Sequence, residues 1–94
     1  MVRAVWNGTV LAESDATVVV EGNHYFPRAS LAEEHFVASA THSICPWKGR
    51  ADYLTVVAGG VEHPDAAWFY PVPKPKAESI RDRVAFAGGI GVEP

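Results

Sequence analysis

The residues best suited to chemistry lie in one short segment, Cys45-Pro46-Trp47-Lys48-Gly49, which holds the only cysteine of the chain. A thiolate is the reactive form of cysteine, and a nearby cation such as Lys48 or a protonated His42 favours that form. His42 could also serve as acid or base for a reaction at Cys45. One hypothesis is therefore a thiol-dependent enzyme with Cys45, His42 and Lys48 as catalytic residues. A lone cysteine beside proline is also typical of a small buried apolar residue.

Aromatic residues give a second interpretation of the same region. Two of the three tryptophans lie beside prolines or turn residues, and with neighbouring tyrosines they could wall a concave site. Such a cleft would hold a heterocycle, a nucleobase or a cationic group by stacking and cation–π attraction, although the same rings would also suit a core. The predicted ligand-binding residues are Trp47, Trp68, Tyr70, Glu21 and Tyr53, with polar contacts from His42, Cys45 and Lys48. The leading hypothesis is thus a small-molecule binding domain of unknown biochemical role with an aromatic-walled pocket, and the thiol-dependent enzyme is the alternative.

A further polar segment, Glu21-Gly22-Asn23-His24-Tyr25, carries an acid, an amide and an imidazole within five residues. Polar recognition or proton transfer uses such groups. Turn formation explains Gly22 and Asn23 equally well.

Length and composition limit the alternatives. A chain of 94 residues suffices for one hydrophobic core, so residues 1–94 are expected to form a single domain. The 48% of hydrophobic and 20% of charged residues are typical of a folded globular protein rather than a disordered one. A formal net charge of -3 argues against a partner nucleic acid, because phosphate contacts require a basic surface.

Metals and common cofactors are not expected. One cysteine cannot build a paired-cysteine zinc site, and the four histidines lack the HExxH spacing of zinc enzymes. The chain also lacks the glycine-rich phosphate loops of dinucleotide-binding folds and P-loop proteins. We therefore predict no metal and no cofactor.

The sequence shows no segment that would direct the chain to a membrane or to secretion. No apolar run approaches the roughly 18 residues of a spanning helix, and the first residues lack the apolar stretch of a secretory signal. We expect a cytoplasmic protein that does not enter membranes. The expected partner is an unidentified small molecule, and an exposed edge strand could also form a homodimer.

The elements that must position these residues are mostly strands. Asn7-Gly8 predicts a tight hairpin between Ala4–Trp6 and Thr9–Leu11, because both turn residues tolerate positive φ. β-branched residues predict a strand over Thr17–Glu21, and Gly22-Asn23 predicts a turn before a short strand that ends at Pro27.

From Ser30 onward, the sequence predicts further strands together with short helices. Ser30-Leu31-Ala32-Glu33 matches a capping box and predicts a helix to about Phe36 or Val37. The later elements are a strand over 51–57, a turn at Gly59-Gly60, strands over 61–63 and 65–70, a helical turn over 76–81, and an edge hairpin over 83–92. Short strands with small helical covers predict a mostly β domain, built as a small antiparallel sheet or partly open barrel.

Several motifs together resemble the family numbered 427 among the domains of unknown function, and the likeness runs almost from end to end. The motifs are Trp6-Asn7-Gly8, Val19-Val20-Glu21-Gly22-Asn23, Tyr25-Phe26-Pro27, Cys45-Pro46-Trp47-Lys48-Gly49, Tyr53, Asp65-Ala66-Ala67-Trp68, Tyr70-Pro71, Pro73 and Val84-Ala85-Phe86.

The resemblance implies a tent-like β-rich fold, similar in outline to methionine sulfoxide reductase B and to zinc-binding guanine-nucleotide-exchange-factor-like proteins. The family also carries a nucleotidyltransferase-like label. Nucleotidyl transfer requires closely spaced carboxylates that hold Mg²⁺, and this chain has no Asp-x-Asp pair. Zinc-binding relatives use Cys-x-x-Cys motifs, which are also missing. The resemblance therefore predicts a fold and no particular reaction.

Overall fold

Short β-strands make up most of the chain in the computed structural model, which describes residues 1–94. The strands are β1 (Val2–Trp6), β2 (Thr9–Ser14), β3 (Val18–Val20), β4 (Asn23–Tyr25), β5 (Phe36–Cys45), β6 (Gly49–Ala58), β7 (Val61–Phe69), β8 (Val84–Phe86) and β9 (Gly91–Glu93), and the 3₁₀ helices are η1 (Arg28–Ser30), η2 (Glu33–His35) and η3 (Pro75–Ile80). This confirms the predicted mostly β fold with short helical insertions. None of its helices has the length and apolar character needed to cross a bilayer.

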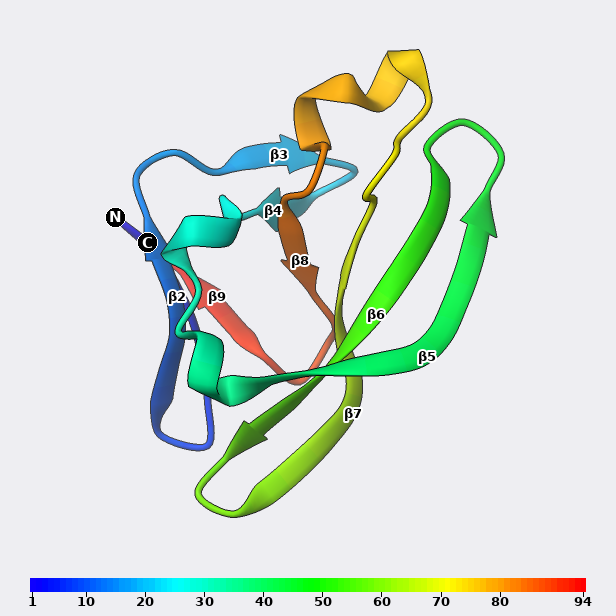
Figure 1. Ribbon diagram of the computed structural model, residues 1–94. Coiled ribbons are helices and arrows are strands. Elements are labelled where there is room, and N and C mark those ends of the chain that lie inside the picture. The colour runs from blue at the N-terminus through cyan, green and yellow to red at the C-terminus, as the bar shows by residue number, and fades with distance from the viewer.

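The strands form three antiparallel sheets with the orders β2-β1-β9, β3-β4 and β5-β6-β7-β8. The long strands β5, β6 and β7 curve through the molecule, η3 lies at one end, and the three-stranded sheet lies to the side (Figure 1). The sheets remain separate, so they do not close into a barrel. The likeness in outline to methionine sulfoxide reductase B remains a prediction.

Both predicted tight hairpins are confirmed. Asn7 and Gly8 adopt φ values of 50° and 71° between β1 and β2, and Gly59 and Gly60 adopt 62° and 75° between β6 and β7. These left-handed conformations match the twist of the flanking strands. The side-chain amide of Asn7 also donates a hydrogen bond to the carbonyl of Ala58 at 3.0 Å, so the two hairpin ends are joined.

Gly60 and Gly88 provide a matched test of backbone strain. A Cβ added at either residue meets no atom within 4 Å, but only Gly60 has a positive φ, of 75°. We expect Gly60→Ala to lower the free energy of unfolding by about 1 kcal/mol, because left-handed backbone disfavours residues with a Cβ. Gly88→Ala should be neutral or slightly stabilising. Urea unfolding of both variants measures the difference, and equal values would contradict this origin of the strain.

The helix predicted to begin at Ser30 and to end near Val37 is wrong. The chain forms only the single turns η1 and η2 before β5 starts. The N–H of Ala32 instead donates to the carbonyl of Leu11 at 2.8 Å, and the Leu31 side chain is buried in the core. Pairing with β2 therefore overrides the local capping pattern.

The predicted edge hairpin over residues 83–92 is also wrong. β8 pairs with β7, whereas β9 pairs with β1 in a different sheet. Ile90 lies between the two strands and is buried, so the connection crosses from one sheet to the other instead of folding back.

Two hydrophobic clusters hold the sheets together. The larger one joins the three-stranded sheet to β6, β7 and β8, and includes Leu11, Phe26 and Val84. The smaller one contains the buried residues Tyr25, Ala51, Tyr70, Ala77, Ile80 and Ala85, which come from β4, β6, β8, η3 and the segment after β7. Side chains alternate across the four-stranded sheet, so its two faces contribute to different clusters.

Candidate functional site

The turn that contains Cys45 to Gly49 packs against the proline-rich segment after β7. The N–H of Lys74 donates to the carbonyl of Lys48 at 2.9 Å, and the Lys74 ammonium donates to the carbonyl of Pro46 at 2.6 Å. Gly49 has a φ of 109°, and a Cβ there would lie 3.5 Å from the carbonyl oxygen of Val72. These two distant parts of the sequence are therefore fixed beside each other.

Lys48 is the centre of the candidate site. Lys48 is only 7% exposed, and its ammonium donates a hydrogen bond to the carboxylate of Glu21. The ammonium also lies 5.4 Å from the ring centroid of Trp47 and 5.5 Å from that of Tyr70, within the range of cation–π attraction. A buried cation is thus held by one carboxylate and two aromatic rings.

Glu21 reaches Lys48 from the turn between β3 and β4. Glu21 and Gly22 have φ values of 54° and 80°, as in a type I′ hairpin turn. The predicted turn was one residue later, at Gly22-Asn23. The first turn position requires a positive φ, which asparagine and glycine adopt more readily than glutamate. The short asparagine side chain can also form local hydrogen bonds that the longer glutamate side chain does not form. The strained backbone at Glu21 therefore accompanies a carboxylate that bonds to a distant residue.

Electrostatic interactions keep both Lys48 and Glu21 charged. Burial alone would lower the pKa of Lys48, but the hydrogen bond to Glu21 and the nearby Tyr25 and Tyr70 oxygens raise it above its ordinary value. The hydrogen bond from Lys48 lowers the pKa of Glu21. Burial raises the pKa of Tyr70, so its phenol stays protonated beside the ammonium.

Tyr53 and Trp68 place two further aromatic rings on one face of the four-stranded sheet. Tyr53 and Trp68 are opposite each other on β6 and β7, with ring centroids 6.4 Å apart. The Trp68 indole N–H donates to the Tyr25 hydroxyl at 3.3 Å, and the Ser43 and Tyr53 hydroxyls are bonded at 2.9 Å. Tyr53 and Trp68 are half-buried.

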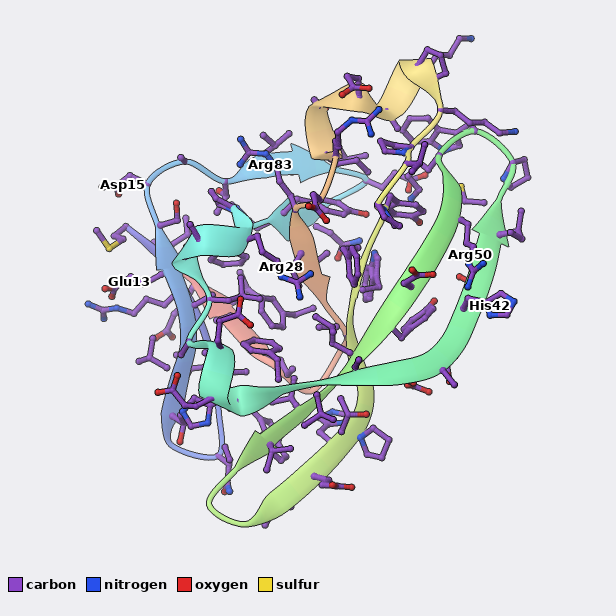
Figure 2. The ribbon with its side chains drawn as sticks, in the orientation of Figure 1. Glu13, Asp15, Arg28, His42, Arg50 and Arg83 are labelled. Atoms are coloured by element: carbon purple, nitrogen blue, oxygen red, sulfur yellow. The ribbon has the colours of Figure 1, made fainter.

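Cys45 belongs to this group, whereas His42 does not. Cys45 is half-buried and packs against the smaller hydrophobic cluster. Successive side chains of a strand point to opposite faces, so Ser43 and Cys45 share one face of β5 and His42 lies on the other. His42 is exposed and lies beside Arg50 on the outer side of the β5–β6 hairpin (Figure 2). The structure therefore separates the imidazole from the thiol.

We call the assembled residues the Lys48 cluster. Its members are Glu21, Tyr25, Cys45, Trp47, Lys48, Tyr53, Trp68 and Tyr70. Every sequence-predicted site residue except His42 belongs to it. Tyr25 was not predicted, because neither its burial nor the hydrogen bond from Trp68 has a local signal in the sequence.

The structure has one cavity, and it does not lie at the Lys48 cluster. That cavity has a volume of about 300 Å³ and is lined by Gly22, Asn23, His24, Phe86 and Val92. The sequence indicated the polar segment that holds the first three residues, but Phe86 and Val92 join them only through the tertiary fold. No group of three or more His, Cys, Asp or Glu side chains lies close enough together to hold a metal ion.

A comparison with models of protein families gives a match over almost the whole chain. The family model described as Domain of unknown function (DUF427) matches residues 1–92. No curated protein matches the chain. The matched region includes every motif on which the sequence resemblance depends, from Trp6 to Phe86.

Proposed function

The chain belongs to the family described as Domain of unknown function (DUF427), as the sequence predicted, and from this premise we propose that it is a small-molecule binding domain whose ligand binds at the Lys48 cluster. The ligand would carry an anionic group for the Lys48 ammonium and a planar ring for the exposed aromatic surfaces. The proposed contact residues are Trp47, Lys48, Tyr53, Trp68 and Tyr70, with Glu21 as the group that the ligand displaces.

The observation that carries this proposal is that the Lys48 side chain is only 9% exposed while its ammonium lies within 5.5 Å of two aromatic ring centroids. A buried ion pair is a weak source of stability, since the desolvation of both charges offsets their attraction. An apolar residue would fill the same place without that cost. A buried cation beside exposed aromatic surface is better explained by recognition of an anion.

The closed arrangement of the Lys48 cluster is consistent with displacement of Glu21. The Glu21 side chain is 52% exposed and stands on a hairpin turn next to Gly22, so it can leave Lys48 without disturbing the core. Trp47 is 38% exposed and lies over the same ammonium. A ligand carboxylate or phosphate could replace the Glu21 carboxylate while its ring stacks on the Trp47 indole.

Tryptophan fluorescence tests the proposal. We expect small aromatic carboxylic acids to change the emission of the wild-type protein and their uncharged amides to have a weaker effect. Trp47→Ala should reduce the affinity at least about tenfold, because the stacking surface is lost. Trp6→Phe is the control, since Trp6 contacts the His63 ring and packs against the other hydrophobic cluster. An unchanged affinity in Trp47→Ala, or equal responses to acids and amides, would contradict the proposal.

Cys45→Ser separates binding from the thiol-enzyme hypothesis. A binding domain should keep its affinity in this variant, because the thiol would lie beside the ligand without reacting. The thiol hypothesis has Lys48 as its remaining activating residue, since His42 lies on the opposite face of β5.

A homodimer and a cytoplasmic location both remain predictions. Light scattering would measure the oligomeric state.

A further inference from the structure

β5 is a long edge strand whose outer edge has no partner in the fold. It ends the order β5-β6-β7-β8, and β6 is the only strand that pairs with it. None of the backbone hydrogen bonds made by turns, loops and caps involves residues 36–45. Alternate residues of an antiparallel strand direct their N–H and C=O groups to opposite sides, so about half of these groups in β5 face away from β6. They lie on the outer side of the curved sheet (Figure 1).

The other sheet edges are short or covered. β3 and β9 have only three residues each. The carbonyl of Leu11 on β2 accepts the N–H of Ala32 at 2.8 Å, so the η1–η2 segment covers part of that edge. Phe26, which follows β4, and Val84 of β8 exchange two backbone hydrogen bonds, so the edges of β4 and β8 meet each other.

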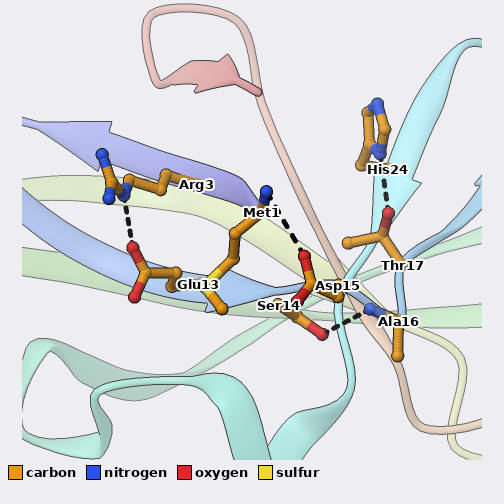
Figure 3. A network of polar contacts seen from close by, with 8 residues as sticks. All are labelled: Met1, Arg3, Glu13, Ser14, Asp15, Ala16, Thr17 and His24. Atoms are coloured by element: carbon orange, nitrogen blue, oxygen red, sulfur yellow. Dashed lines mark hydrogen bonds and ion pairs between the residues drawn. The ribbon is translucent and has the colours of Figure 1, made fainter.

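Charged side chains also protect the β2 edge but not the β5 edge. Glu13 on β2 pairs with Arg3, and the Asp15 carboxylate that follows lies 3.3 Å from the N-terminal ammonium (Figure 3). Natural proteins use charges and proline to prevent edge strands from pairing with other chains. β5 contains no lysine, arginine, aspartate, glutamate or proline, and residues 41–44 are all exposed. Its edge is therefore open to a further strand.

A bulge limits the part of β5 that a further strand can use. The register with β6 shifts between Ala38 and His42. The Ser39 and Thr41 hydroxyls in this bulge donate to the carboxylate of Asp65 on β7 at 2.5 and 2.8 Å, which fixes the bulge against the sheet. Because bulges disrupt regular pairing, the usable edge is the segment 41–45 on the far side of the bulge.

The segment 41–45 can pair with a copy of itself. A two-fold dimer interface is isologous, so the same strand from each copy must form both sides. Residues that face each other across antiparallel strands share one face of the sheet, so a single residue must lie on the axis opposite its own copy. With Ser43 on the axis, Ile44 of each copy lies opposite His42 of the other. This register uses the whole segment 41–45.

The side chains around the segment favour this register. Ile44 is 70% exposed, and it would bury apolar surface against the second copy. On β6, Arg50 lies opposite Ile44 and Asp52 lies opposite His42. A row of side chains across the dimer would begin at Arg50 of one copy and end at Asp52 of the other. No like charges would therefore face each other across the two-fold axis.

We propose that β5 pairs antiparallel with β5 of a second copy of this chain, centred on Ser43, and joins the two four-stranded sheets into one continuous sheet. The backbone groups along the open edge supply the hydrogen bonds of the interface. A five-residue strand pair is smaller than the interface of a stable dimer, so the association is weak and depends on protein concentration. The proposal does not depend on the proposed function, since residues 41–44 lie outside the Lys48 cluster.

Cysteine crosslinking tests the register. In a Cys45→Ser background, Ser43→Cys places two thiols opposite each other at the axis, within reach of a disulfide. Val61→Cys in the same background is the matched control, because Val61 is 50% exposed and follows the β6–β7 turn instead of lying on β5. During mild oxidation we expect covalent dimers of Ser43→Cys to form at least about tenfold faster than those of Val61→Cys. Equal rates would overturn the proposed register.

Amide hydrogen exchange of the wild-type protein tests the interface without any substitution. Exchange at residues 41–45 should slow as the protein concentration rises to about 1 mM. Ile44→Lys should abolish this dependence, because a charge on an edge strand opposes pairing, whereas Ile44→Val should keep it. Thermal unfolding establishes that both variants are folded.

Exchange that does not depend on concentration in the wild-type protein would overturn the proposal, whatever the behaviour of the variants. Protection of the same amides only after another polypeptide is added would assign the β5 edge to a different partner, and would overturn self-association as well. Failure of ligand binding at the Lys48 cluster leaves both measurements unaffected, because neither uses a ligand.

Discussion

Glu21→Ala is expected to destabilise the protein more than Lys48→Met, although each substitution removes the same ion pair. The Lys48 side chain is 9% exposed and the Glu21 side chain is 52% exposed. Removal of the carboxylate leaves the Lys48 ammonium buried with only aromatic rings around it, which costs on the order of 2 to 3 kcal/mol. Removal of the ammonium leaves a carboxylate that water can solvate, and Met fills much of the space of the lysine chain. Lys48→Met should therefore stay within about 1 kcal/mol of the wild type.

Urea unfolding of the two variants measures this asymmetry, and Glu21→Gln provides a graded control. Glutamine keeps a neutral acceptor for Lys48, so its unfolding midpoint should lie between those of the wild type and Glu21→Ala. Greater damage from Lys48→Met would mean that the ammonium stabilises the fold beyond its pairing with Glu21. Lys48→Met should still lose the binding of aromatic acids, which separates recognition from stability.

The same ion pair gives a pH dependence whose sign is fixed. Lys48 lowers the pKa of Glu21 in the folded protein, so the pair contributes stability above the ordinary glutamate value of about 4.3. This contribution is lost as the pH falls from there through the lower folded value. Acidification to about pH 3 should consequently destabilise the wild type more than Glu21→Gln. Equal losses in both proteins would assign the acid sensitivity to other carboxyl groups, such as Asp65, whose pKa the Ser39 and Thr41 hydroxyls lower.

Phe26→Ala is expected to have the largest effect on the fold. The Phe26 side chain is fully buried, and its ring meets that of Phe86 edge-on with centroids 5.5 Å apart. Truncation of a buried phenylalanine costs about 3 to 5 kcal/mol through lost burial and the cavity left behind. Domains of this size have a total stability of about 5 to 15 kcal/mol, so the variant should unfold well below the wild-type temperature.

Calorimetry and urea unfolding of Phe26→Ala measure that loss. Phe26→Leu fills most of the volume and should recover more than half of it. Val19→Ala is the surface control on the neighbouring strand, where a residue that is 56% exposed should change stability by less than about 0.5 kcal/mol. A loss below about 1 kcal/mol in Phe26→Ala would mean that the Phe26 side chain, which follows β4, contributes little to holding the sheets together.

Local signals predicted the parts of the fold that depend on neighbouring residues. Asn7-Gly8 and Gly59-Gly60 identified their hairpins because each turn requires two left-handed conformations in sequence. The segment over 38–45 gave no strand signal, although it forms most of β5. Its side chains are mostly exposed on both faces, so no alternation between apolar and polar residues marks the strand.

Partners distant in sequence could not be predicted in the same way. The composition of the segment around Lys48 marks it in the sequence, but the pairing of Lys48 with Glu21 depends on the position of the β3–β4 turn. The face of β5 that carries His42 depends on strand register, which a single sequence does not specify for an exposed strand. The cavity lined by Gly22, Asn23, His24, Phe86 and Val92 joins segments that are far apart in the sequence, so no local signal predicts it.

The position of β1 between β2 and β9 has a consequence for synthesis on the ribosome. The first hairpin emerges early, but one edge of β1 stays open until Gly91 to Glu93 have been translated. The nascent chain therefore carries an unpaired strand edge while the residues between β1 and β9 are made, and such an edge can pair with other polypeptides. Closure of this sheet therefore waits for β9, and the long sequence separation between β1 and β9 makes it slow.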